Sequence, residues 1–137
     1  MPATVVILGD ATLEVRILPG IAREYGWLLK RVQDVSDLRN IREQCRIVAI
    51  LFQADQSQLA PVDVIDAIRA AAPGARLILC HRFADSTPWP AMAAAGAFHS
   101  LRVPFAVPEV RQSFGFVWAS QGIPAPASLM KTWKAVA

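Results

Sequence analysis

The sequence of 137 residues has few charged residues and only two cysteines, and each shortage excludes a class of protein. Charged residues make up 18% of the chain and hydrophobic residues 54%, which excludes a disordered protein and favours one folded domain. Cys45 and Cys80 are too few for a disulfide framework. They indicate two buried, reduced thiols, as in a cytoplasmic protein.

Long hydrophobic runs and dense clusters of charge are also missing. The apolar runs are too short to cross a bilayer, and no basic segment precedes the first of them, so we expect no membrane association and no signal peptide. The net charge of +3 comes from scattered arginines and lysines that do not interleave with aromatic residues. We therefore expect no direct nucleic-acid binding.

The chain does contain five short apolar runs that alternate with helical patterns. The runs cover residues 5–8, 27–32, 47–52, 75–80 and 98–103, and the helical patterns cover residues 11–25, 36–44, 62–72, 89–95 and 107–120. This alternation predicts parallel β-α-β units. We expect a three-layer, doubly wound α/β fold whose five-stranded parallel sheet has the flavodoxin-like strand order 2-1-3-4-5.

Local signals refine these boundaries. Pro19 and Gly20 predict a kink or a break within residues 11–25, and Ser36 is the expected N-cap of the next helix. The segment 121–137 begins with QGIPAPAS, which is typical of a linker, and ends in a pattern that fits a short helix. The expected organisation is one domain over residues 1–120, followed by a linker and a short C-terminal helix.

Several phrases resemble the receiver domain of bacterial two-component response regulators. Residues 96–105, GAFHSLRVPF, are similar to the receiver phrase GADDYLTKPF, in which the peptide bond before proline is usually cis. The phrase APGARLILC at residues 72–80 resembles the approach to the fourth receiver strand, and Pro108-Glu109-Val110 resembles the opening of the last helix. The resemblance covers residues 4–120 and implies a receiver-like domain.

A working receiver has a specific set of reactive groups at the carboxyl edge of its sheet. Two acidic residues after the first strand hold Mg²⁺, and an aspartate at the end of the third strand accepts a phosphoryl group. A serine or threonine ends the fourth strand, and a lysine precedes the proline of the fifth. Carboxylates bind the hard cation, while the metal and the lysine neutralise charge on the phosphoryl oxygens.

This sequence has lost most of that set. The acidic pair corresponds to Gly9 and Asp10, the phosphoacceptor to Phe52 or Gln53, the hydroxyl to Cys80, and the lysine to Val103 before Pro104. Neither candidate for the acceptor position can form an acyl phosphate. The resemblance therefore implies a degenerate receiver that is not an enzyme, binds no cofactor and signals by contact with other proteins.

Two alternatives stay open. Asp55, two or three residues beyond the expected acceptor, is an alternative phosphoacceptor, with Mg²⁺ held near Asp10. The second alternative is a small-molecule site in the pocket that the lost acidic residues leave, between Gly9, Gln53, Cys80 and Val103.

The resemblance also implies a contact surface. In receivers the fourth helix, the fifth strand and the fifth helix form the usual surface for dimerisation or for an output domain. The residues that we expect on this surface are Trp89, Met92, Arg102, Phe116 and Trp118. We expect a homodimer or a partner such as a transcriptional output domain.

One further cluster is weaker. Cys80 and His81 are adjacent, and His99 is expected on the neighbouring strand, which raises the hypothesis of a thiol nucleophile or a metal site. Adjacent residues of a strand point to opposite faces, so we expect neither.

Overall fold

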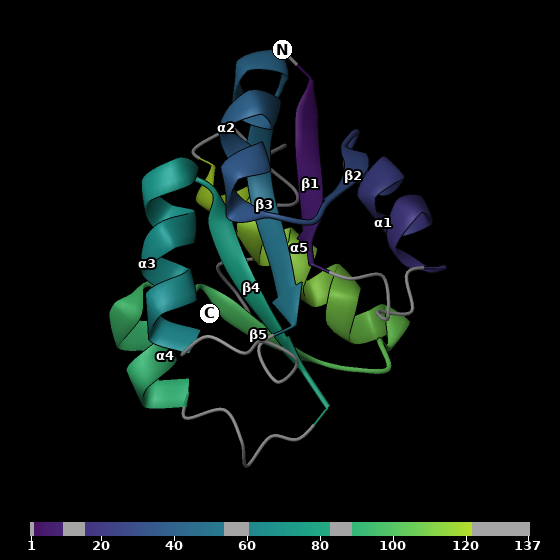
Figure 1. Ribbon diagram of the computed structural model, residues 1–137. Coiled ribbons are helices and arrows are strands. Elements are labelled where there is room, and N and C mark those ends of the chain that lie inside the picture. The colour runs from purple at the N-terminus through teal and green to yellow at the C-terminus, as the bar shows by residue number, and fades with distance from the viewer. Residues whose placement is uncertain (1, 10–15, 54–60, 83–88, 122–137) are drawn as a thin grey trace.

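The computed structural model describes residues 2–9, 16–53, 61–82 and 89–121 of the chain. These residues form one parallel sheet with helices on both faces (Figure 1). The five strands are β1 (Ala3–Leu8), β2 (Leu28–Val32), β3 (Arg46–Gln53), β4 (Arg76–His81) and β5 (His99–Arg102). Their order is β2-β1-β3-β4-β5, which confirms the predicted topology.

The five helices divide between the two faces of the sheet. They are α1 (Leu18–Glu24), α2 (Val35–Gln44), α3 (Pro61–Ala71), α4 (Trp89–Ala95) and α5 (Val107–Ser120). Buried residues of α1 and α5 pack with one set of strand side chains, and those of α2, α3 and α4 pack with the other. We call these sets the α1/α5 core and the α2/α3/α4 core. β3 lies between them and is buried at every position after Arg46, as its continuous apolar sequence predicts.

Two expected helix starts are displaced in the structure. The described helix α1 begins at Leu18, so Pro19 lies in its first turn and does not kink a longer helix. Proline is favoured there because the first-turn N–H groups have no partner within the helix. The N-cap of α2 is Asp34, not Ser36, and its backbone N–H donates to Oδ2 of Asp37 at 3.3 Å. An acidic residue three positions after the N-cap can accept this hydrogen bond. Asp34 has such a residue in Asp37, and this pairing favours Asp34 over Ser36 as the N-cap.

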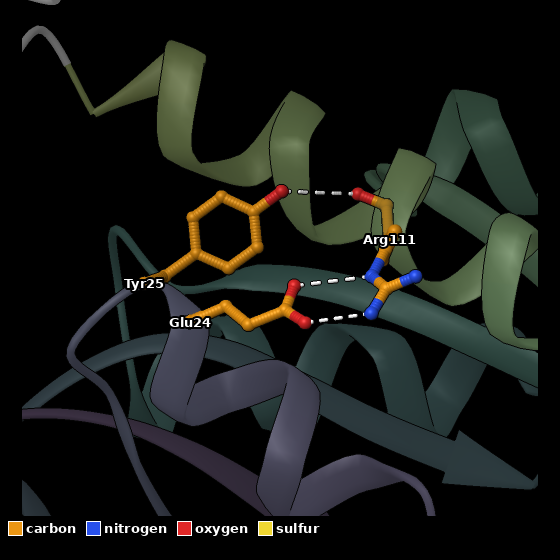
Figure 2. A network of polar contacts seen from close by, with 3 residues as sticks. All are labelled: Glu24, Tyr25 and Arg111. Atoms are coloured by element: carbon orange, nitrogen blue, oxygen red, sulfur yellow. Dashed lines mark hydrogen bonds and ion pairs between the residues drawn. The ribbon is translucent and has the colours of Figure 1, made fainter.

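A polar contact joins α1 to α5 across the outer surface of their layer (Figure 2). The Glu24 carboxylate accepts hydrogen bonds from Nε of Arg111 at 3.1 Å and from Nη2 at 2.7 Å. The Tyr25 hydroxyl donates to the backbone carbonyl of Arg111 at 3.2 Å. The Tyr25 ring stacks on Trp27 with centroids 4.9 Å apart, and Trp27 packs on Phe114 of α5. Both ends of the contact are thus tied to the α1/α5 core.

Within the described part of the chain, every helix is too short or too polar to cross a membrane.

Candidate functional site

The carboxyl ends of the strands bring the expected pocket residues to one edge of the sheet. Leu8 of β1 pairs with Phe52 of β3, so Gly9 comes level with Gln53. Gln53 in turn pairs with Cys80 of β4. Gly9, Gln53 and Cys80 therefore form a transverse row at the carboxyl edge. Asp10 and Asp55 lie outside the described residues.

The two faces of the sheet distinguish Phe52 from Gln53. Phe52 is buried in the α2/α3/α4 core, whereas Cys80 belongs to the α1/α5 core. Because successive side chains of a strand alternate between faces, Gln53 lies on the same face as Cys80. Of the two candidates for the acceptor position, Gln53 and not Phe52 therefore shares the face of Cys80.

Val103, which the resemblance aligns with the receiver lysine, lies in an apolar environment. Its side chain is only 5% exposed and packs in the α1/α5 core, on the same face as Gln53. Its backbone N–H donates to the carbonyl of His81 at 2.9 Å. The peptide bond from Val103 to Pro104 is cis, as the resemblance implied, and Pro104 is exposed.

The Gln53 side chain is buried without a hydrogen-bonding partner. It is 6% exposed, and neither Oε1 nor Nε2 bonds to any group of the described protein. Nδ1 of His81 is likewise buried and unpaired in the described structure, but the alternation of β4 places His81 on the opposite face from Cys80. A buried amide without a partner is rare in folded proteins and requires an explanation.

The described residues at this edge do not fit Mg²⁺. The side chains of Gly9, Gln53, Cys80 and Val103 offer one neutral amide oxygen, from Gln53, and no carboxylate. Magnesium prefers carboxylate oxygens in near-octahedral geometry. Among the residues that the structure describes, there is also no group of three histidine, cysteine or acidic side chains placed to hold a metal ion.

The histidines and Cys80 do not form a single cluster. His99 pairs with Ile78, whereas Cys80 pairs with Leu101, so His99 lies nearer the amino end of the sheet. Nδ1 of His99 shares a hydrogen bond of 3.0 Å with Oγ of the buried Ser113 on α5, and burial lowers the pKa of His99. No sequence pattern predicts this pair, because a serine within the α5 segment indicates a solvent-exposed position.

Only some of the residues predicted for the contact surface are exposed. Phe116 is 38% exposed and Arg102 is exposed, while Trp89 and Trp118 are half-buried and pack against the α2/α3/α4 and α1/α5 cores respectively. Met92 is 2% exposed, so its inclusion in the surface is corrected. The short α4 is rich in alanine, and Met92 is its buried side chain, packed in the α2/α3/α4 core.

A cavity of about 430 Å³ opens at the opposite, amino edge of the sheet. Its lining includes Arg42, Cys45 and Arg46, together with residues that connect α3 to β4. Both α2 and α3 end here, and helix carboxyl ends carry partial negative charge. The two arginines therefore offset helix dipoles at a point remote from Gln53.

Comparison with known proteins identifies the fold. No protein-family model matches the chain, and no curated protein matches it in sequence. A response regulator from Thermotoga maritima superposes with a TM-score of 0.71 at 12% identity, over 85% of this chain and 98% of that chain. The chain has the receiver fold.

Other receiver folds match over similar lengths. A proposed pilus assembly protein from Burkholderia thailandensis matches with a TM-score of 0.66 at 16% identity, over 87% of this chain and 99% of that one. The receiver domain of a sensor histidine kinase from Pseudomonas aeruginosa matches with a TM-score of 0.60 at 20% identity, over 82% of this chain and 93% of that domain. That domain holds a magnesium ion in its active-site cleft.

Proposed function

We propose that this chain is an atypical response-regulator receiver domain that signals through contact with other proteins and without phosphorylation. The observation that carries the proposal is the position of Gln53. It stands at the end of β3, level with Cys80 of β4 and on the same face of the sheet. A carboxamide cannot become an acyl phosphate under the conditions that phosphorylate an aspartate. Val103, buried among apolar side chains, supplies no cation to neutralise a phosphoryl group.

The proposal carries further expectations. The domain is not an enzyme, requires no cofactor and acts in the cytoplasm. Its partner is a second copy of the chain or an output protein, for example a transcription regulator. The similarity to a pilus assembly protein supports a wider range of protein partners than transcription alone.

A phosphorylation assay tests this function directly. The protein is incubated with acetyl phosphate and Mg²⁺, and its intact mass is measured over time. We expect no phosphoryl adduct, because Gln53 stands at the acceptor position. A receiver domain with an intact acidic set serves as the positive control for the donor.

The same assay distinguishes the alternative phosphoacceptor. A stoichiometric adduct that is retained in Asp66→Asn but lost in Asp55→Asn would establish Asp55 as the acceptor and overturn the proposal. Asp66 is a suitable control because it is an exposed carboxylate on α3. Asp10→Asn tests whether such an adduct depends on Mg²⁺ bound near Asp10.

A further inference from the structure

Two arginines at the amino edge of the sheet have no partner within the described protein. Arg42 stands in the last turn of α2 and Arg46 opens β3, and both side chains are exposed. Neither guanidinium forms an ion pair or a hydrogen bond with a residue that the structure describes. By contrast, Arg111 of α5 is held by the Glu24 carboxylate. Arg42 and Arg46 are therefore available to an external anion.

Both arginines line the cavity of about 430 Å³ at this edge. Figure 1 shows α2 and α3 ending on the side of the sheet where β3 and β4 begin. The rest of the described lining is uncharged and consists of Cys45, Ile47, Ala72, Pro73 and Ala75. A cavity of this volume with a mostly apolar lining and a few charged groups has the composition of a small-molecule site.

Apolar side chains form the uncharged part of the cavity wall. Ile47 is 7% exposed and packs in the α2/α3/α4 core, and Ala75 is half-buried against the same core. Cys45 is 1% exposed, and its thiol donates to the carbonyl of Ile41 at 3.3 Å, which ties it to the last turn of α2. The wall thus offers contact to an apolar ligand body.

The described lining is positive even after the helix dipoles are counted. Each helix carboxyl end is equivalent to roughly −0.5 of a charge, so α2 and α3 together offset about one of the two guanidinium charges. Glu43 follows Arg42 on α2, but it does not line the cavity, and adjacent residues of a helix do not face each other. The lining therefore favours an anion.

We infer that this cavity binds a small organic acid, in which one carboxylate is attached to an apolar body. The carboxylate pairs with Arg42 and Arg46, whose planar guanidinium groups match its two oxygens. The body packs against Ile47 and Ala75. An inorganic anion would gain only exposed ion pairs, which contribute little to binding. The site lies at the opposite edge of the sheet from Gln53, so the inference goes beyond the proposed function and does not depend on it.

Three matched probes separate the contribution of the charge from that of the body. 3-Phenylpropanoate carries both, 3-phenylpropanamide keeps the body without the charge, and acetate keeps the carboxylate without the body. Binding is followed by the δ1-methyl resonance of Ile47 in ¹³C-methyl-labelled protein, assigned by its absence from the spectrum of Ile47→Val. The ring current of a bound phenyl group shifts this resonance. Ile78, fully buried in the α1/α5 core, supplies the reference methyl.

The expected result is a saturable shift of the Ile47 methyl with 3-phenylpropanoate, with a dissociation constant of about 1 mM or below, and no saturation with the amide or with acetate in that range. The double variant Arg42→Gln/Arg46→Gln should bind about tenfold more weakly or worse, because it removes both charges. Arg39→Gln should keep the wild-type affinity. Arg39 is a suitable control because it is an exposed arginine of α2 outside the cavity lining.

A third variant tests the apolar part of the site. Ala75→Leu fills space in the cavity and leaves both arginines in place, so it should also weaken binding about tenfold. Arg42 and Arg46 are exposed, so their variants should fold even if a larger side chain at position 75 disturbs the α2/α3/α4 core. The arginine variants then test the site on their own.

The inference is overturned if the amide shifts the Ile47 methyl with the affinity of the acid, because the arginines would then play no part. Equal saturation with acetate would show an adventitious ion only. A loss of affinity in Arg39→Gln as large as in the double variant would show that overall charge, and not the cavity, attracts the acid. An Ile47 methyl that no probe moves would refute the site outright. None of these results changes the expected outcome of the phosphorylation assay.

Discussion

At the scale of single residues, one neutral and one apolar side chain lie buried on the same face near the carboxyl edge of the sheet. Val103 is 5% exposed within the α1/α5 core, and Gln53 on the same face is 6% exposed. β3 and β5 flank β4, so their backbones lie about 10 Å apart, and Val103 stands two residues beyond Leu101, which is level with Gln53. The loss of charge at one position therefore makes a charge at the other unfavourable.

This dependence predicts the result of restoring the receiver residues. Val103→Lys should lower the free energy of unfolding by about 2–4 kcal/mol, because it buries an unpaired ammonium group. Gln53→Asp should also destabilise the protein. The double variant should recover about 1–3 kcal/mol of the summed loss, since the two charges pair. Urea denaturation of the four proteins measures this coupling, and strict additivity would mean that the two side chains do not meet.

The Glu24–Arg111 pair predicts a specific pH dependence. Its hydrogen bonds to Arg111 lower the pKa of Glu24 from the usual 4.5. The folded state thus favours the ionised carboxylate, so its contribution is present above pH 4.5 and is lost as the pH falls through the lowered pKa. Melting temperatures of wild-type and Glu24→Gln protein should differ slightly at neutral pH and converge in acid. Both side chains are about half exposed, so salt should also shrink the difference.

At the scale of elements, the turn after α4 depends on one glycine. Gly96 has a φ of +120°, and its N–H bonds back to α4, as does the N–H of Ala97, which donates to the Met92 carbonyl at 3.0 Å. This pattern closes the helix and turns the chain into β5. A Cβ at Gly96 would lie 2.7 Å from Cδ of Arg69, whose guanidinium donates to the carbonyl of Ala95.

Two glycine variants separate backbone strain from helix propensity. Gly96→Ala should destabilise the protein by about 1–3 kcal/mol, because alanine rarely adopts this φ and the Arg69 side chain must move. Gly20→Ala is the matched change on an exposed position of α1, where a Cβ meets nothing within 4 Å. It should stabilise by up to about 1 kcal/mol. Equal effects in thermal or urea unfolding would contradict the assignment of strain to Gly96.

Helices were predictable from the sequence wherever neighbouring residues alone indicate them. Residues 89–95 and 107–120 form helices with the expected bounds, because apolar spacing and an early proline mark them within a few turns. The N-cap of α2 was misplaced, because two capping residues, Asp34 and Ser36, stand two positions apart. Trp89 and Trp118 are half-buried because they pack against residues of other helices and strands, and no local sequence pattern predicts such contacts.

At the scale of the whole molecule, the pairing of distant strands decided what the sequence left open. Which of Phe52 and Gln53 shares the face of Cys80 follows from the register of β3 against β4. A shift of one residue moves a side chain to the other face, so the sequence of β3 alone does not fix it. Met92 and the His99–Ser113 pair likewise depend on contacts between elements far apart in the chain.

The outer surface of the molecule yields a final prediction about assembly. Phe116 of α5 is 38% exposed, and its ring meets His99 of β5 edge-on, so an aromatic side chain stands at the α5 side of the edge strand. Arg102 is exposed at the carboxyl end of β5. An exposed aromatic beside an arginine has the composition of interface residues that contribute most to binding. We therefore expect Phe116 to lie at the centre of the proposed homodimer contact.

Phe116→Ser should weaken self-association about tenfold or more, because it removes the aromatic contact without disturbing the core. Leu28→Ser is the matched control, since Leu28 is 50% exposed on β2 at the opposite edge of the sheet. Trp118→Ala is less suitable, because Trp118 packs against the α1/α5 core and its loss would also destabilise the fold. Analytical ultracentrifugation over a concentration series measures the three dissociation constants. A wild-type protein that stays monomeric would refute the homodimer, whereas dissociation by Leu28→Ser alone would move the contact to β2.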